Sequence, residues 1–300
     1  MIGAWIGKPG QEATLENNPH PLDKLIRFRE THPLKQARIN DQTWTYLACG
    51  SGEQALLILG GALSTAESSF ETIQAYETGY RVFSLTYPPV GSMGALTDGL
   101  LEVLALEGIA RTHVFGGSLG AGVAHVLVRR HPQVVDKMAL SAFGLYNARN
   151  LGRASMAMRL FRLAPYRLTA SYYRRRMRLL LQGVEPETRQ FYLAYTDDLF
   201  DHQLDRKSLI GQFELMADLM QNYDRYQVYS PVDRPGRVLI LQAKDDTGFA
   251  PDEQAALRDT YPGAQVHLFE SGGHLAGLSQ RQEFEDVRKN FLLKSKQASP

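Results

Sequence analysis

Short apolar runs rich in branched side chains recur along the chain and predict eight strands. They cover residues 36–39, 44–49, 56–59, 81–85, 112–115, 137–141, 238–241 and 265–269. Stretches with helical periodicity lie between most of these runs, at residues 66–78, 93–107, 119–131, 252–261 and 279–293. This alternation predicts an α/β fold, with a mostly parallel eight-stranded sheet flanked by helices on both faces. Ligands of such sheets bind beyond the carboxyl ends of the strands.

The stretch from residue 146 to residue 230 breaks the alternation. It predicts several helices and no strand, and it is divided by Pro165 and by the Gly-Val-Glu-Pro sequence at residues 183–186. We therefore expect a core formed by residues 1–145 and 231–300, with an inserted helical cap at 146–230. Such a cap would exclude water and shape a substrate pocket. Residues 1–30 have no predicted structure, and residues 294–300 are expected to be a disordered tail.

One predicted strand ends in the sequence Val-Phe-Gly-Gly-Ser-Leu-Gly at residues 114–120. A Gly-x-Ser-x-Gly pattern between a strand and a helix is typical of a nucleophile elbow, a strained turn that exposes the serine hydroxyl. The flanking glycines let neighbouring backbone pack where a Cβ would clash. Ser118 is therefore the predicted nucleophile.

A serine hydroxyl needs a base to take its proton, and the base needs a partner that orients it. Asp246 follows the predicted strand 238–241, and His274 follows the strand 265–269 in a Ser-Gly-Gly-His turn. Both would lie at the same edge of the sheet as Ser118. His274 would take the proton and later protonate the leaving group, while Asp246 would fix the imidazole tautomer.

Other residues compete for these two roles. Asp245 is the alternative to Asp246, and His267 is the alternative to His274. His267 lies inside a predicted strand, where a structural role is expected. His125 and His131 fall on or just after the predicted helix that follows Ser118, and they too are expected to be structural.

The negative charge of a tetrahedral intermediate requires backbone N–H donors. One donor is expected from Leu119, the residue after the nucleophile. The other should come from the loop after the strand 56–59, which has the sequence Gly-Gly-Ala-Leu-Ser at residues 60–64. Ala62 is the predicted second donor, and Leu63 is the alternative.

These residues make nearly the whole chain resemble the α/β-hydrolase superfamily, in which serine, acid and histidine follow one another in this order. Within the superfamily, the chain is most similar to maspardin-like proteins. The similar segments are His-Pro-Leu-Lys at 32–35, Trp-Thr-Tyr at 44–46, Thr-Gly-Tyr-Arg-Val at 78–82, Leu-Thr-Tyr-Pro at 85–88 and the elbow at 114–120.

The resemblance to maspardin-like proteins implies a role in binding other proteins. Those proteins lack a histidine at the equivalent of His274, which this chain has. Two other positions depart from the superfamily pattern: Gly60 stands where a histidine usually precedes the oxyanion-loop glycine, and Ala243 stands where the acid loop commonly begins with glycine. The histidine favours catalysis over the binding role.

Composition and short motifs exclude several classes of protein and of site. Hydrophobic residues make up 44% and charged residues 22% of the 300 residues, as in ordinary globular proteins, and the net charge of +1 gives no reason to expect nucleic acid binding. The single cysteine, Cys49, excludes an internal disulfide and a cysteine metal cluster. The first eight residues do not predict a signal peptide, and no dinucleotide or phosphate-loop motif occurs. We expect a cytoplasmic protein without a cofactor or a metal.

The first half of the predicted cap contains nine arginines and no acidic residue between Arg149 and Arg178, with apolar residues between them. The second half carries the acidic residues: Asp197, Asp198, Asp201, Asp205, Glu214 and Asp218. Pairing between the two halves, together with a solvated basic face, is the favoured interpretation. Contact with an anionic membrane, or steering of an anionic substrate, is the alternative.

The sequence therefore predicts a carboxylesterase-like serine hydrolase that acts through an acyl-enzyme on a small, apolar ester. Cleavage of an amide or a carbon–carbon bond is less favoured. The alternative is a noncatalytic, maspardin-like adaptor on the same fold. The presence of Ser118, Asp246 and His274 together favours the enzyme, because a binding module has no need of all three.

Overall fold

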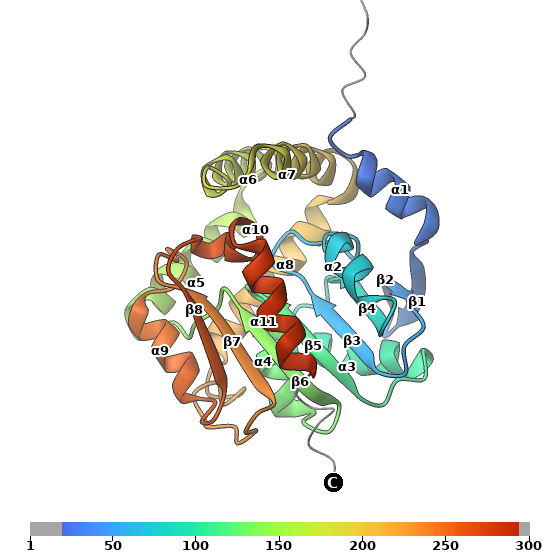
Figure 1. Cartoon of the computed structure of the whole chain (residues 1–300). Helices are drawn as coiled ribbons and strands as arrows, with labels where there is room; N and C mark the ends of the chain where they lie inside the picture. The colour runs from blue at the N-terminus through green and yellow to red at the C-terminus, as the bar shows by residue number, and fades with distance from the viewer. Residues whose placement is uncertain (1–19, 294–300) are drawn as a thin grey trace, which may run out of the picture.

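The computed structural model describes residues 20–293, and an eight-stranded sheet forms its centre (Figure 1). The predicted disordered tail lies outside these residues, and so do the first eight residues, which do not predict a signal peptide. The strands are β1 (Lys35–Ile39), β2 (Gln42–Cys49), β3 (Ala55–Leu59), β4 (Arg81–Thr86), β5 (Thr112–Gly117), β6 (Val135–Ser141), β7 (Val238–Ala243) and β8 (Gln265–Phe269).

The strand order is β1-β2-β4-β3-β5-β6-β7-β8. β2 pairs antiparallel with both β1 and β4, and all other neighbours pair in parallel. The mostly parallel eight-stranded sheet predicted from the sequence is confirmed. The carboxyl ends of β3 to β8 therefore share one edge, which we call the carboxyl edge.

Alternate residues of the central strands face opposite sides of the sheet, and both sides are buried. In β3, Leu57 and Leu59 pack into one cluster with helices α3 (Met93–Leu106), α4 (Leu119–Arg130) and α9 (Pro251–Asp259). Leu56 and Ile58 pack into a second cluster with α1 (Asp23–Thr31), α2 (Phe70–Tyr76) and α11 (Arg281–Leu293). A sheet buried on both faces explains why its strands are almost continuously apolar.

Three helices differ from the prediction. α1 lies in a segment with no predicted structure, because only Leu25 and Phe28 of this helix are buried and they give little periodic signal. α2 begins at Phe70 rather than at residue 66, because the preceding residues form a turn in which the Ser68 hydroxyl accepts a hydrogen bond from the Thr65 N–H (2.6 Å). The predicted last helix, at residues 279–293, begins at Arg281 as α11, and a short helix that was not predicted, α10 (Ala276–Ser279), precedes it.

Helices without strands occupy the stretch between β6 and β7. They are α5 (Ala148–Leu163), α6 (Tyr166–Leu180), α7 (Pro186–Asp198) and α8 (Arg206–Gln221), with a π-helical turn, η1 (Leu199–Gln203). α6 and α7 lie side by side at the top of the molecule in Figure 1. α5 has no fully buried residue, whereas α8 buries eight. The division into a core and a cap at residues 146 and 230 stays a prediction, and we call α5–α8 the cap helices.

The expected pairing of the cap arginines with the cap acids occurs for two of the nine. Arg174 pairs with Asp197 and Asp201, both at 2.7 Å, and Arg162 pairs with Glu214 at 3.2 Å. In the described part of the chain, the others have neither an ion pair nor a side-chain hydrogen bond. They are Arg149, Arg153, Arg159, Arg167, Arg175, Arg176 and Arg178.

Pairing within the cap is therefore partial and leaves a solvated basic face, because other groups use the remaining acids. Asp198 pairs with Arg29 of α1 (2.8 Å). Asp205 caps α8. Asp218 accepts a hydrogen bond from the backbone at the start of α3 (2.8 Å).

His125 of α4 is fully buried in the core, in agreement with a structural role. Its Nε2–H donates to the Val228 carbonyl (3.0 Å), and its Nδ1 accepts from the Tyr261 hydroxyl (2.7 Å). Burial, together with the nearby charge of Arg129, lowers the pKa of His125 well below its ordinary value of 6.5. Burial also lowers the pKa of His113. Both imidazoles are therefore held neutral by the fold.

We expect the free energy of unfolding to decrease as the pH falls below about 6.5, by up to about 1.4 kcal/mol per pH unit for each histidine. The unfolded chain binds a proton in this range and the folded chain does not, so acid favours unfolding. Urea unfolding between about pH 5.5 and 7.5 measures the slope. His125→Gln should flatten it, and an unchanged slope in that variant would contradict the assignment.

Candidate active site

The turn between β5 and α4 places Ser118 at the carboxyl edge of the sheet. Its φ of 50° and ψ of −116° lie outside the regions that side-chain-bearing residues ordinarily adopt. Two glycines make this turn possible. A Cβ at Gly116 would lie 2.6 Å from the Gly120 carbonyl oxygen, and one at Gly120 would lie 2.0 Å from the Leu59 carbonyl oxygen. The backbone thus has the geometry expected of a nucleophile elbow.

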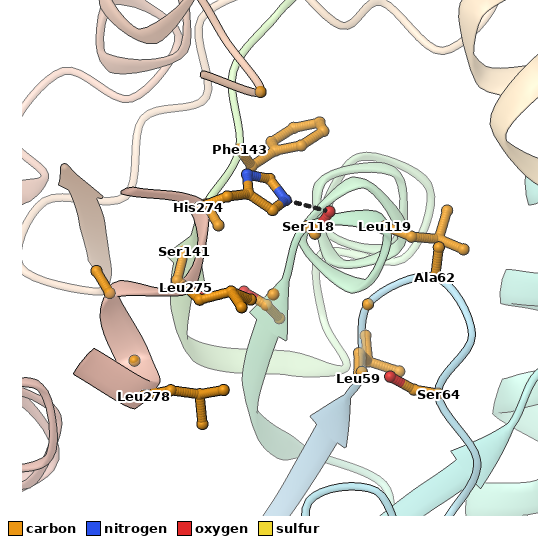
Figure 2. Close-up of a pocket in the computed structure, with 18 of the residues that line it drawn as sticks. Leu59, Ala62, Ser64, Ser118, Leu119, Ser141, Phe143, His274, Leu275 and Leu278 are labelled. Atoms are coloured by element: carbon orange, nitrogen blue, oxygen red, sulfur yellow. Dashed lines mark hydrogen bonds between the residues drawn. The ribbon is translucent and has the colours of Figure 1, made fainter. Parts of the chain in front are cut away.

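Loops after β5, β7 and β8 bring the three predicted catalytic residues together. The Ser118 hydroxyl lies 3.0 Å from His274 Nε2 (Figure 2), and His274 Nδ1 lies 3.0 and 3.1 Å from the two carboxylate oxygens of Asp246. We call this the hydrogen-bond chain. The Asp246 side chain is 3% exposed and that of His274 is 20% exposed. The carboxylate is therefore shielded from water, while the imidazole remains open to a ligand.

The acid loop fixes the direction of the Asp246 carboxylate. The Gly248 N–H donates to Asp246 Oδ1 (2.7 Å). A Cβ at Gly248 would lie 2.7 Å from His274 Nδ1 and 3.0 Å from Asp246 Oδ1. Only glycine therefore fits beside this pair, a requirement that sequence reasoning did not identify.

Asp245, the alternative acid, points elsewhere. Its two carboxylate oxygens accept hydrogen bonds from the backbone N–H groups of Gly272 and Gly273, at 3.1 and 2.8 Å. These glycines immediately precede His274, so Asp245 holds the turn that carries the histidine. The two neighbouring carboxylates thus make different contacts.

His267, the alternative histidine, and His131 contact partners outside the hydrogen-bond chain. His267 lies 2.9 Å from Glu283 of α11, and His131 lies 2.8 Å from Asp98 of α3. Neither makes a hydrogen bond to Ser118 or to Asp246. Among the described residues that bear metal-binding groups, His32, Cys49 and Glu77 have ligand atoms within 4.8 Å of one another, and none of them belongs to the hydrogen-bond chain.

Two backbone N–H groups beside Ser118 have no acceptor in the part of the chain that the structure describes. They belong to Leu119, the first residue of α4, and to Ala62 in the loop after β3, and Figure 2 shows both residues beside Ser118. Buried N–H groups are rarely unpaired. Two unpaired donors next to a serine hydroxyl are suited to bind an oxyanion. The alternative donor, the Leu63 N–H, already donates to Gln212 Oε1 (2.5 Å).

Two side chains that the sequence did not reveal hold the loop at residues 60–64. The Tyr87 hydroxyl, after β4, donates to the Gly60 carbonyl (2.7 Å). Gln212 of α8 is fully buried and accepts from Leu63, whose φ is 66°. The partners lie far apart in the sequence, so no local signal could have identified them.

A cavity of about 630 Å³ opens beside Ser118 and His274. Most of its lining side chains are apolar or aromatic and come from the cap helices and the loops at the carboxyl edge. They include Leu63, Phe143, Tyr146, Tyr173, Met177, Leu180, Tyr192, Leu199, Met216 and Leu219. The side-chain hydroxyls of Tyr146, Tyr173 and Tyr192 make no hydrogen bond within residues 20–293. The cavity is therefore suited to a largely apolar ligand with a few polar groups.

Comparison with known proteins adds an independent finding. A model of the alpha/beta hydrolase family matches residues 56–287. Maspardin from Mus musculus is 25% identical over 268 residues, which cover 85% of this chain and 82% of maspardin. The 2-hydroxy-6-oxononadienedioate/2-hydroxy-6-oxononatrienedioate hydrolase of Escherichia coli strain K12 is 22% identical over 267 residues, which cover 81% of this chain and 88% of that enzyme.

Solved structures show the same fold. The crystal structure of a hydrolase from Pseudomonas aeruginosa PA01 matches with a TM-score of 0.68 at 19% identity. The match covers 87% of this chain and 98% of that one. At this identity the similarity concerns the fold alone.

We expect Gln212→Met to lower kcat about 10- to 100-fold in hydrolysis of p-nitrophenyl butyrate, with a smaller change in KM. The substitution keeps the volume of the side chain but removes the acceptor for Leu63, so the loop that carries the Ala62 N–H loses its fixed position. Steady-state kinetics and thermal unfolding measure the two effects separately. Gln133→Met, on an exposed glutamine between α4 and β6, is the control. A normal kcat in a folded Gln212→Met protein would contradict the positioning role.

Proposed function

Because the chain belongs to the alpha/beta hydrolase family, we propose that it is a serine hydrolase that cleaves carboxylic esters through an acyl-enzyme intermediate. The observation that carries the proposal is the hydrogen-bond chain from Ser118 through His274 to Asp246, with two unpaired backbone donors beside the serine. Fold alone would not justify an activity. The proposal rests on the side chains that the fold brings together.

In the proposed reaction, the Ser118 oxygen attacks the ester carbonyl while His274 Nε2 takes the hydroxyl proton. The carbonyl π electrons move onto the oxygen, which becomes the oxyanion of a tetrahedral intermediate. The intermediate collapses and breaks the bond to the alcohol, which leaves with the proton from His274. Water then repeats the sequence on the acyl-enzyme and releases the carboxylic acid.

Asp246 and the backbone donors contribute electrostatically. The Asp246 carboxylate keeps the proton of neutral His274 on Nδ1, so that Nε2 can accept a proton from Ser118. It also stabilises the imidazolium that forms. The N–H groups of Leu119 and Ala62 would donate to the oxyanion, an interaction that is stronger in the transition state than in the ground state.

The lining of the cavity supports an apolar acyl or alcohol group in the substrate. Aliphatic and aromatic side chains form most of its wall, and the tyrosine hydroxyls can orient a polar group. We propose that the protein cleaves an ester bond in preference to an amide or a carbon–carbon bond. A series of p-nitrophenyl esters compared with matched anilides tests this preference.

A second candidate is a noncatalytic adaptor, the role implied by the resemblance to maspardin-like proteins, of which mouse maspardin is 25% identical to this chain. An adaptor could use the same fold, but it gains nothing from a histidine placed 3.0 Å from a strained serine. Reaction with a covalent serine probe separates the two candidates, because an adaptor without an activated nucleophile would not react.

We expect Ser118→Ala to lower kcat for p-nitrophenyl butyrate about 10⁴- to 10⁶-fold, because the variant lacks the attacking oxygen. It should also lose labelling by a fluorophosphonate, with mass spectrometry of the wild type placing the label on residue 118. Ser141→Ala, on the neighbouring strand β6, is the matched control and should still be labelled. Turnover like that of the wild type in a pure Ser118→Ala preparation would reject the proposal.

Asp246→Asn should lower kcat on the order of 10⁴-fold, because an amide favours the wrong tautomer of His274. Asp245→Asn should lower kcat far less, since an asparagine oxygen can still accept a hydrogen bond from the backbone of the turn before His274. The two variants carry the same substitution at neighbouring positions, and steady-state kinetics compare their kcat values. If Asp245→Asn were the more damaging change, the role of the acid would have to be reassigned.

A further inference from the structure

The outer surface of α5 and α6 carries an unusual density of exposed apolar side chains. Six of the thirteen large apolar residues that are exposed in the described chain lie between Met156 and Leu179. They are Met156, Leu160, Leu163, Leu168, Tyr172 and Leu179. Those on α5 are three or four residues apart and therefore share one side of the helix. The rings of Phe161 and Tyr172 lie 5.1 Å apart, which joins the end of α5 to α6.

The seven unpaired arginines lie on the same two helices, and all of them are exposed. No acidic residue occurs in α5 or α6. We call the seven arginines and the six exposed apolar residues the cap face. Its arginines repel one another, and contact of its apolar side chains with water is unfavourable. A partner that offers both anions and an apolar layer would relieve both costs.

Charge complementarity selects among partners. A second copy of the chain, docked through the same face, would place arginines against arginines. A nucleic acid offers phosphates but no layer that could take up aliphatic side chains such as Leu163, which is 81% exposed. An anionic bilayer offers both, with headgroups for the guanidinium groups and an acyl boundary for the apolar side chains.

The position of α6 connects the cap face with the catalytic cavity. Tyr173, Met177 and Leu180 on its inner side line the cavity, whereas Tyr172 and Leu179 are exposed on its outer side. A second cavity is lined by Arg153 of α5 and Arg176 of α6, and it reaches Asp246 and Thr247. Arg176 and Phe249 line both cavities, so the second cavity adjoins the catalytic cavity between α5 and α6.

We propose that the cap face docks the protein on anionic phospholipid membranes. The unpaired arginines bind lipid headgroups, and the exposed apolar side chains insert into the boundary of the acyl layer. Docking places α6 between the bilayer and the catalytic cavity, so that esters dissolved in the bilayer reach Ser118 through the adjoining second cavity between α5 and α6. This last step rests on the proposed function, whereas docking itself does not.

Co-sedimentation with vesicles tests docking. The full chain with Ser118→Ala is mixed with phosphatidylcholine vesicles that contain phosphatidylserine, at low and high salt, so that turnover plays no part. We expect binding at low salt that decreases strongly at high salt, because salt screens exposed charges. Vesicles of phosphatidylcholine alone should bind at least tenfold more weakly.

Charge variants with a matched control locate the binding surface. Changing Arg159, Arg167 and Arg175 together to Gln should lower the partition coefficient about 100-fold, or about 3 kcal/mol at roughly 1 kcal/mol for each arginine. The control changes Arg81, Arg225 and Lys289 to Gln. These side chains also lack ion pairs with described residues and lie outside the cap helices, and the control should bind like the parent protein.

Apolar variants test insertion. Changing Leu163 and Leu168 together to Ser should lower binding roughly tenfold or more, because apolar contact with the acyl layer is lost. Leu106 and Leu293, which are 66% and 56% exposed on α3 and α11, provide the matched control pair. Circular dichroism checks that each variant keeps its helices.

Several results would overturn the docking proposal. They are absence of binding to anionic vesicles at low salt, an equal loss in the charge control, and dimerisation that Leu163→Ser and Leu168→Ser abolish. Binding of an RNA or DNA duplex as tightly as of vesicles would reassign the face to nucleic acid. Vesicle binding without ester turnover by the wild type would retain docking and reject the proposed function, and turnover without vesicle binding would do the reverse.

Discussion

The backbone of Ser118 adopts a φ of 50°, and close backbone contacts on either side keep it there. Gly120 lies so near the Leu59 carbonyl that any side chain would collide with β3, and Gly116 packs against the first turn of α4 in the same way. These contacts join β3, β5 and α4 into one rigid corner. The loop after β3, with the Ala62 N–H, therefore lies beside the serine. The strain at one residue determines where both the nucleophile and the candidate oxyanion donors are.

The other parts of the site are held by backbone hydrogen bonds rather than by their own side-chain packing. Gly248 and the Gly272–Gly273 turn donate to Asp246 and Asp245, so that two consecutive carboxylates tie the acid loop to the histidine turn. Gln212 links the cap to the site. Its side chain on α8 accepts a hydrogen bond from Leu63 and so holds the loop after β3. The cap is thus connected to the candidate site, and a change in its position would affect both the shape of the pocket and the position of the candidate oxyanion donors.

The sequence was sufficient to predict the sheet, the elbow and the order of the three candidate catalytic residues, because these depend on local patterns. Branched apolar runs specify strands, and glycine spacing specifies the turn at Ser118. It could not identify Gln212, whose partner Leu63 is 149 residues away. Nor could the sequence show which of the nine cap arginines are paired: the six acids listed for the second half of the cap were available, but three of them are engaged by α1, α3 and α8. Such contacts depend on the folded arrangement of distant segments.

The central claim is that Ser118 forms a covalent acyl-enzyme, and pre-steady-state kinetics test it most directly. Wild-type protein is mixed rapidly with p-nitrophenyl butyrate, quenched with acid and analysed by mass spectrometry. The account predicts a burst of p-nitrophenol that approaches one equivalent for each protein molecule, with one butyryl group on the peptide that contains Ser118. Turnover without a burst and without an acylated peptide, or acylation of a different residue, would contradict the account.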